Sequence, residues 1–144
     1  MENITSPERS LLMSRIAQRD TKPEMVVRRL IHSLGYRFRL QRRELPGTPD
    51  LVLPRFRKVV FVHGCFWHRH PGCKLASFPK TKIDFWRDKF SRNIERDNRK
   101  EAELIALGWD VLTVWECQTR KPEALRVRLR DWLSDSINCN NSNN

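Results

Sequence analysis

The sequence contains no run of eighteen or more apolar residues, so we expect no segment that spans a membrane. Residues 1–10 carry acidic side chains and no apolar stretch, which argues against a secretory signal peptide. With 39% hydrophobic and 31% charged residues, most of the chain is neither disordered nor of low complexity. For a chain of 144 residues we expect one domain, at 1–137. The polar segment 138–144 is expected to be a disordered tail. Without an export signal, we expect a location in the cytosol.

Acidic residues are few compared with basic ones. The chain has 17 Asp and Glu against 28 Lys and Arg, a formal net charge of +11 at pH 7. A surplus of this size in a compact chain favours a polyanionic partner, and nucleic acid is the commonest one. Solubility alone, or attraction to an anionic membrane surface, is the alternative that composition leaves open.

Hydrophobic periodicity and turn residues predict the element order ααβββαβα. Thr21 and Glu24 have capping-box spacing at the start of the second helix, and Gly35 follows its end. This order indicates a compact α/β fold with a small sheet. The expected helices are 6–18, 21–35, 84–107 and 122–133, and the expected strands are 36–40, 50–53, 58–63 and 111–115.

Cysteine and histidine cluster in the segment 62–73, which is too rich in Cys, His, Pro and Gly for regular structure. Zinc prefers thiolate and imidazole donors that converge tetrahedrally. Cys65 and Cys73 can close one loop, a histidine between them can be a third ligand, and Cys117, after a predicted strand, is the natural fourth. The alternative is a set of ordinary buried thiols and surface histidines.

If zinc takes His70, then His63 and His68 are free for other chemistry in one cleft. A neutral imidazole accepts a proton from water at physiological pH, which suits a general base. Asp50 directly precedes the apolar residues 51–53. It is either a residue that closes a turn or a magnesium ligand, because Mg²⁺ takes carboxylate oxygens.

Three aromatic side chains, Phe66, Trp67 and Trp86, lie among polar and basic residues. Exposed rings beside cations suit stacking on bases or insertion between them. The alternative is that they form a local core over the loop at 62–73.

Four segments together resemble the very-short-patch-repair (Vsr) endonucleases, in order, from about Ser6 to Leu133. The resemblance implies a restriction-endonuclease-like fold with a central mixed sheet, flanking helices and a structural zinc site. It also implies an enzyme that nicks one strand of duplex DNA 5′ of the T in a T·G mismatch, which arises when 5-methylcytosine deaminates, and so starts very short patch repair. The matching segments are LPGTPD at 45–50, FVHGCFWH at 61–68, NIERD at 93–97 and WDVLTVWEC at 109–117.

By this resemblance, Asp50 and the backbone carbonyl of Val62 bind magnesium, and His68 is the general base. His63 is a phosphate or transition-state partner, Glu24 lies near the metal-bound water, and Asp97 orients a histidine. Zinc is held by the set Cys65, His70, Cys73 and Cys117. The rings inserted into DNA beside the mismatch are those of Phe66, Trp67 and Trp86.

The sequence departs from the family pattern in two places. Val62 stands where members often have Thr, and the zinc loop is one residue longer, which bears on the assignment of His70. Related nucleases of this fold commonly carry Glu-x-Lys where this chain has Phe61-Val62-His63, so a histidine takes over the role of the base.

The family resemblance also implies a setting for the enzyme: a monomer in the bacterial cytoplasm, associated with the nucleoid. A cytosine-5 methyltransferase is the functional companion that it implies, and a MutL-type mismatch-repair protein is a candidate partner. Two other functions remain open from the residues alone. One is a zinc-stabilised DNA-binding module without catalysis, and the other is a restriction endonuclease that cuts both strands of matched DNA.

Overall fold

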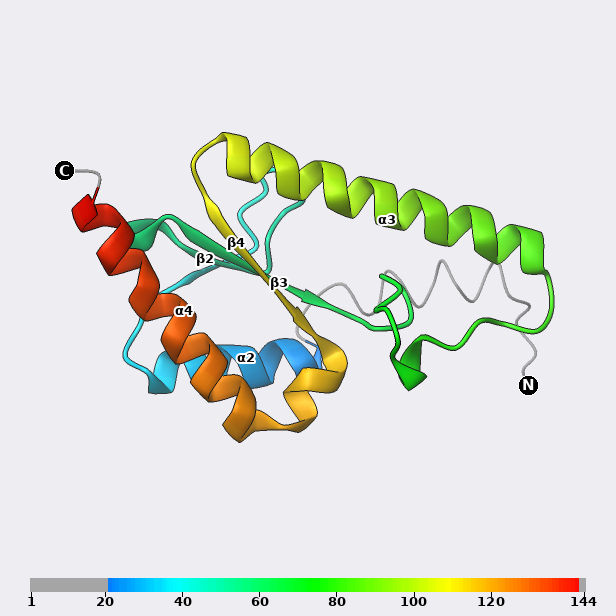
Figure 1. The fold of residues 1–144 in the computed structure, drawn as a ribbon, viewed down its shortest axis with the longest axis horizontal. Helices are drawn as coiled ribbons and strands as arrows, with labels where there is room; N and C mark the ends of the chain where they lie inside the picture. The colour runs from blue at the N-terminus through cyan, green and yellow to red at the C-terminus, as the bar shows by residue number, and fades with distance from the viewer. Residues whose placement is uncertain (1–20, 143–144) are drawn as a thin grey trace.

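The computed structural model describes residues 21–142, with side chains as far as residue 135, and shows a mixed four-stranded sheet between helices (Figure 1). The strand order is β1-β2-β3-β4; β1–β2 and β2–β3 are antiparallel pairs, and β3–β4 is parallel. The helices are α2 (Lys22–Ser33), α3 (Ile83–Ala106) and α4 (Pro122–Ser142). The strands are β1 (Arg39–Leu40), β2 (Leu51–Leu53), β3 (Lys58–His63) and β4 (Asp110–Trp115). Three 3₁₀ segments complete the set: η1 (Pro54–Phe56), η2 (Lys74–Ala76) and η3 (Glu116–Arg120).

Both faces of the sheet are covered, as its continuous apolar strands require. On one face, buried residues of β2, β3 and β4 pack against α2 and α4, which lie on the same side of the sheet in Figure 1. On the other face, Leu104 of α3 packs against Val52 and Val59. Truncating a fully buried leucine of this core, such as Leu129, to alanine is expected to cost about 2–5 kcal/mol.

The parallel pairing of β3 and β4 positions the site. A parallel pair needs a crossover connection, and α3 supplies it. Val62 is the register partner of Val114, and His63 that of Trp115, so both strands end at the same level. Segments 52 residues apart in sequence, at Cys65 and Cys117, therefore begin side by side.

The start of α2 confirms the predicted cap. Thr21 is the N-cap residue, and its hydroxyl accepts the Glu24 backbone N–H at 3.3 Å. The helix ends before Gly35, whose φ of +91° lies in the left-handed region that favours glycine. The Glu24 carboxylate accepts the Thr21 hydroxyl and not the Thr21 backbone N–H that a capping box predicts, so this half of the prediction differs from the structure.

Three predicted elements differ from the structure or lie outside it. The strand expected at 36–40 is only Arg39–Leu40, because the Tyr36 N–H bonds the Ile31 carbonyl at the end of α2. Helix α4 runs to Ser142 rather than ending at Leu133, so its backbone continues into the tail that we expected to be disordered. Helical hydrogen bonds extend from the packed part of α4, which composition alone does not predict. The helix expected at 6–18 lies outside the described residues.

Within the described part of the chain, no helix combines the length and the apolar character needed to cross a membrane.

Candidate active site and metal centre

A cleft of about 1250 Å³ opens where β2 begins and β3 ends. Lysine and arginine side chains contribute to its walls, among them Arg43, Lys89, Arg96 and Lys100. Seven acidic residues line the cleft as well, so a polyanionic substrate would need bound cations in addition to these side chains. Its lining includes seven residues that the sequence singled out: Glu24, Asp50, Val62, His63, Trp67, His68 and Asp97.

Asp50 lies just before β2, and its Oδ2 accepts the backbone N–H of Val62 at 2.6 Å. The N–H and C=O groups of one strand residue point to the same side, so the Val62 carbonyl faces the side where the Asp50 carboxylate lies. Burial raises the pKa of Asp50 to about 7, the Val62 N–H opposes this rise, and the Glu24 charge adds to it. A carboxylate that is costly to ionise in the free protein is well suited to hold a cation.

Glu24 is 3% exposed and lies in the first turn of α2. Its Oε2 accepts an N–H of Arg28 at 3.3 Å, and its Oε1 accepts the Thr21 hydroxyl. Its effect on the pKa of Asp50 shows that the two carboxylates share one environment. The predicted second role of Glu24, beside its place in the helix cap, is therefore sterically reasonable.

His68 and Asp97 form a directed pair across the cleft. His68 Nδ1 lies 2.6 Å from Asp97 Oδ2, which joins the loop at 64–73 to α3. A proton on Nδ1 that is donated to Asp97 leaves Nε2 with its lone pair free to accept another. The geometry is that of an oriented general base.

His63, at the end of β3, stacks on His68 with ring centroids 3.9 Å apart and an interplanar angle of 7°. Burial, followed by the nearby His68, lowers the pKa of His63 to about 3, so its ring is neutral at pH 7. Donor atoms of His63, His68 and Asp97 lie within 4.8 Å of one another. However, the in-plane lone pairs of parallel rings do not converge, and Asp97 already bonds His68. The cluster therefore favours acid–base chemistry over metal coordination.

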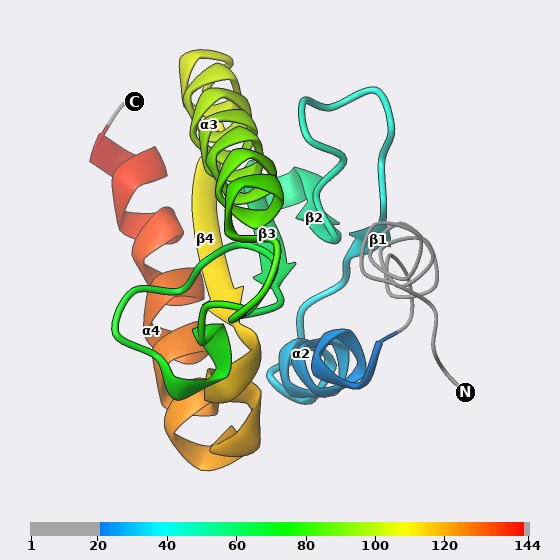
Figure 2. The same ribbon diagram turned by 90° about the vertical axis from the view of Figure 1, so that its right-hand side faces the viewer.

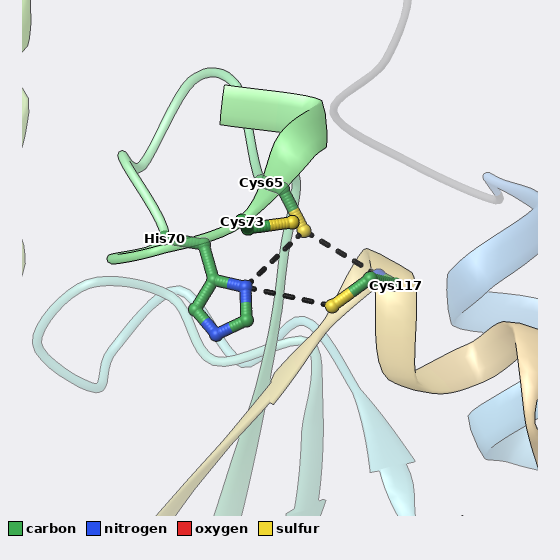
Figure 3. A group of neighbouring side chains, drawn as sticks. All are labelled: Cys65, His70, Cys73 and Cys117. Carbon is green, nitrogen blue, oxygen red and sulfur yellow. Dashed lines mark hydrogen bonds between the residues drawn. The ribbon is translucent and has the colours of Figure 1, made fainter. Parts of the chain in front are cut away.

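The second cluster has the donor chemistry of a metal centre (Figure 3). The donor atoms of Cys65, His70, Cys73 and Cys117 all lie within 4.8 Å of one another. His70 Nδ1 is 3.7 Å from Cys65 Sγ and 3.5 Å from Cys117 Sγ. Three thiols and one imidazole fit a closed tetrahedral site, so these residues can hold a metal such as zinc. The one-residue-longer loop still brings His70 to the thiols.

Hydrogen bonds and one ring contact hold the loop at 64–73 in shape. The His70 N–H bonds the Cys65 carbonyl at 3.0 Å, and the Cys117 N–H bonds Cys65 Sγ at 3.4 Å. The His70 ring stacks on Trp115 of β4 with centroids 4.3 Å apart. The metal centre is thereby tied to the end of the sheet that carries His63.

Arg69 is a residue of this region that sequence reasoning missed. Its φ of +56° turns the chain between His68, which faces Asp97, and His70, which faces the thiols. Its guanidinium lies 4.1 Å from the centre of the Phe90 ring and bonds the carbonyls of Phe66, Ala76 and Ser77. A lone arginine between two histidines gave no signal in the sequence, because its partners are backbone carbonyls and a ring on α3.

The three singled-out aromatic residues lie together, but with different exposure. Trp86 is only 7% exposed and packs against Phe66, Trp67 and Phe90. Phe66 and Trp67 are half-buried, and the Trp67 carbonyl accepts the Asn93 side-chain N–H at 3.1 Å. In this structure Trp86 is thus a core side chain, whereas Trp67 borders the cleft.

A mixed sheet with a carboxylate beside its central strands and a histidine oriented by a second carboxylate in one cleft is typical of enzymes that cleave nucleic-acid backbones. Residues 1–74 match the family model described as DNA mismatch endonuclease Vsr. The chain belongs to this family of DNA endonucleases and has its restriction-endonuclease-like fold.

Relatives match over nearly the whole chain. Type II nicking enzyme V.XorIIP of Xanthomonas oryzae pv. oryzae is 51% identical over 137 residues, 94% of this chain and 100% of the relative. DNA mismatch endonuclease Vsr of Escherichia coli is 45% identical over 130 residues, 87% of this chain and 83% of the relative. Type II nicking enzyme V.NmeAIP of Neisseria meningitidis is 41% identical over 126 residues, 88% and 89% of the two chains. The alternative of a DNA-binding module without catalysis is therefore disfavoured.

Proposed function

We propose that the protein is a magnesium-dependent endonuclease that nicks one strand of duplex DNA 5′ of the T in a T·G mismatch. The observation that carries this proposal is the meeting of Asp50 with the His68–Asp97 pair in one cleft. The name of the Escherichia coli relative supports action on mismatches, whereas the names of the nicking relatives state only that they nick.

The Asp50 carboxylate and the Val62 carbonyl would hold the magnesium ion. Bound there, the ion would neutralise charge that develops on the phosphate and on the leaving 3′ oxygen. The buried Asp50 carboxyl supports this assignment, because a pKa near 7 leaves it readily ionised when a cation is present. Val62 serves as well as Thr here, since only its backbone oxygen is needed.

The remaining chemistry belongs to side chains of the cleft. His68 Nε2 accepts a proton from the attacking water while its Nδ1–H stays bonded to Asp97. The neutral His63 ring can donate its N–H to a phosphate oxygen, and Glu24 can accept a hydrogen bond from water beside Asp50. Attack on the phosphorus leaves a 3′-hydroxyl and a 5′-phosphate.

The Cys65, His70, Cys73 and Cys117 set is proposed to hold structural zinc. A closed four-ligand site has no open position for substrate, so its contribution is to folding. It would fasten the loop that carries His68 to the start of η3.

Choice of the mismatch is proposed to rest on the aromatic residues Phe66, Trp67 and Trp86. A wobble pair unstacks at lower cost than a matched pair, so rings inserted beside it favour T·G sites. Trp86 would leave its present packing to take part. A cytosine-5 methyltransferase as functional companion, a MutL-type partner, a monomeric state and a place at the bacterial nucleoid in the cytoplasm complete the proposal.

The direct test is a strand-resolved cleavage assay on duplexes that differ only in one base pair. We expect magnesium-dependent cutting of the T-containing strand at T·G and intact matched DNA. Cutting of both strands of matched DNA would instead support a restriction endonuclease. Binding without cutting in magnesium would support a non-catalytic module.

A further inference from the structure

The net positive charge of the chain is concentrated in one part of the sequence. Residues 25–83 contain thirteen Lys and Arg and only two acids, Glu44 and Asp50. The remaining residues contain fifteen of each sign, so the whole surplus of +11 lies in this part. The segment includes β1, β2 and β3 with their connections, and β1 is the sheet edge farthest from β4.

A second groove, of about 600 Å³, lies on this edge and outside the cleft. Its base contains Tyr36 and Phe56, whose rings meet edge to face at 5.2 Å and pack against the main core. Arg37, Arg39 and Arg55 also line it, and all three are exposed. Three exposed arginines beside these packed rings give the groove the positive charge that attracts anions.

The three arginines of the groove lack counterions within the described part of the chain. Among residues 21–135, no carboxylate forms an ion pair with Arg37, Arg39 or Arg55. By contrast, Arg42, a short way further along the chain, pairs with Glu44. The three exposed guanidinium groups are therefore available to bind an external anion.

The groove continues into the cleft along β1. Arg39 pairs with Val52 and Leu40 with Leu51, and the Gln41 N–H then bonds the Asp50 carbonyl at 3.3 Å. Gln41 and Arg43 line the cleft itself. At about 3.4 Å per strand residue, Arg39 lies about 7 Å along the strand from Asp50, or about two base-pair steps of DNA.

The geometry points to a second DNA contact: the β1 edge binds the phosphate backbone of the duplex beyond the scissile site, through Arg37, Arg39 and Arg55. The inference extends the proposed function and takes from it only the cleft as the place where DNA is cut. A duplex bound in the cleft passes from Gln41 and Arg43 to the groove along β1. This continuity favours DNA over an acidic segment of another protein.

The test compares the salt dependence of duplex binding by the native protein and by the triple variant Arg37→Gln, Arg39→Gln, Arg55→Gln. Each lost phosphate contact reduces the slope of log K against log salt by about 0.9, so we expect a reduction of about 2 to 3. The matched control is Lys121→Gln, Arg126→Gln, Arg130→Gln, which removes the same charge near α4, on the side opposite β1 (Figure 2). We expect the control to keep nearly the native slope.

Duplex length then locates the contact. With a T·G pair fixing the register, we expect the slope difference to vanish on a duplex that ends about 2 base pairs from the nick on the side of the groove. It should persist when the other side is shortened. Thermal midpoints of all variants are measured to confirm equal folding.

Three results would overturn the inference: an unchanged slope, an equal change in the control, or a change that persists on both shortened duplexes. Loss of binding to poly-glutamate with a native DNA slope would assign the groove to an acidic protein instead. Binding to matched duplex does not depend on nicking. A protein that fails to nick T·G but shows the slope difference would disprove the proposed function alone.

Discussion

The rings of His63 and His68 lie parallel, 3.9 Å apart, while Asp97 holds His68 from its edge at a distance of 2.6 Å. The face of the His68 ring thus packs against His63, and the hydrogen bond to Asp97 fixes the orientation of the same ring. Protonation of both stacked rings would place two cations in contact, and the lowered pKa of His63 keeps that ring neutral. The hydrogen bond to Asp97 gives His68 a defined direction, which fits the role of general base that we propose for it.

The substitution Asp97→Asn tests this orientation. An amide in place of the carboxylate can favour the wrong tautomer of His68, so we expect nicking to fall about 10²- to 10⁴-fold. Asp88→Asn, an exposed change on the same helix, is the control and should nick normally. Metal content and duplex affinity should match the native protein in both. A rate within about threefold of native for Asp97→Asn would contradict the role.

Asp50→Asn tests the carboxylate proposed to bind magnesium. The amide oxygen can still accept the Val62 N–H, so folding should persist while magnesium-dependent nicking is lost. Mismatch binding should be retained, because the change removes negative charge near phosphates. Glu44→Gln, at an exposed cleft residue, is the control. Near-normal nicking by Asp50→Asn in a single-turnover assay would show that the metal lies elsewhere.

The same variant has a predicted pH dependence of stability without magnesium. Asp50 has a pKa of about 7 in the folded protein against an ordinary 3.8, so between these values the folded state holds an extra proton and stability falls as pH rises. His63, at about 3 against 6.5, acts in the opposite sense. Removing Asp50 should therefore make stability rise with pH relative to native, by at most about 1.4 kcal/mol per unit. Urea unfolding at pH 4.5, 5.5 and 6.5 measures it, and a difference independent of pH would contradict the shift.

Cys117→Ser should remove the metal and lower the melting temperature together, because Cys117 joins the loop at 64–73 to the residues after β4. Cys139→Ser is the matched change, since Cys139 lies in the polar C-terminal segment, and it should alter neither quantity. Elemental analysis and thermal denaturation are the measurements. Folded native protein without zinc would refute the assignment of the ion.

The aromatic residues give a paired prediction. Trp86→Ala should lower the free energy of unfolding by about 3–5 kcal/mol, because the ring is buried among Phe66, Trp67 and Phe90. Trp67→Ala should lower the free energy of unfolding less than Trp86→Ala does, and it should lower the affinity for T·G duplex more, since this ring borders the cleft. Denaturant unfolding and titration with T·G and matched duplexes separate the effects. A Trp67→Ala protein that melts early yet binds T·G as native would remove the wedge role.

The sequence predicted most of the sheet, because its strands are locally encoded. The strand Lys58–His63 is predicted and observed with the same bounds, since a run of β-branched residues bounded by turns strongly favours a strand. The convergence of the four metal donors was also predicted, from a loop and a later strand end. Local pattern was enough for the strand, and cysteine spacing was enough for the three thiols, whereas the choice of His70 came from the family resemblance.

Features that depend on tertiary packing were not predictable. Arg69 bonds backbone carbonyls, so its role is not visible in neighbouring residues. The packing of Trp86 against Phe66 fits the local core that the sequence offered as an alternative, which could not be separated from insertion between bases without the structure. The short β1 likewise results from a bond between Tyr36 and the end of α2. The His63–His68 stack required the loop to fold back over β3, which spacing alone does not determine.

The parallel pairing of β3 and β4 has a consequence for the order of folding. Cys65 follows one strand and Cys117 the other, and the chain that contains α3 must close between these strands before they can pair. Such non-local pairing is slow, since the chain closes a long loop before the contacts compensate for it. The four-donor set is complete only after that step. The kinetics of metal uptake during refolding will therefore report when the sheet closes.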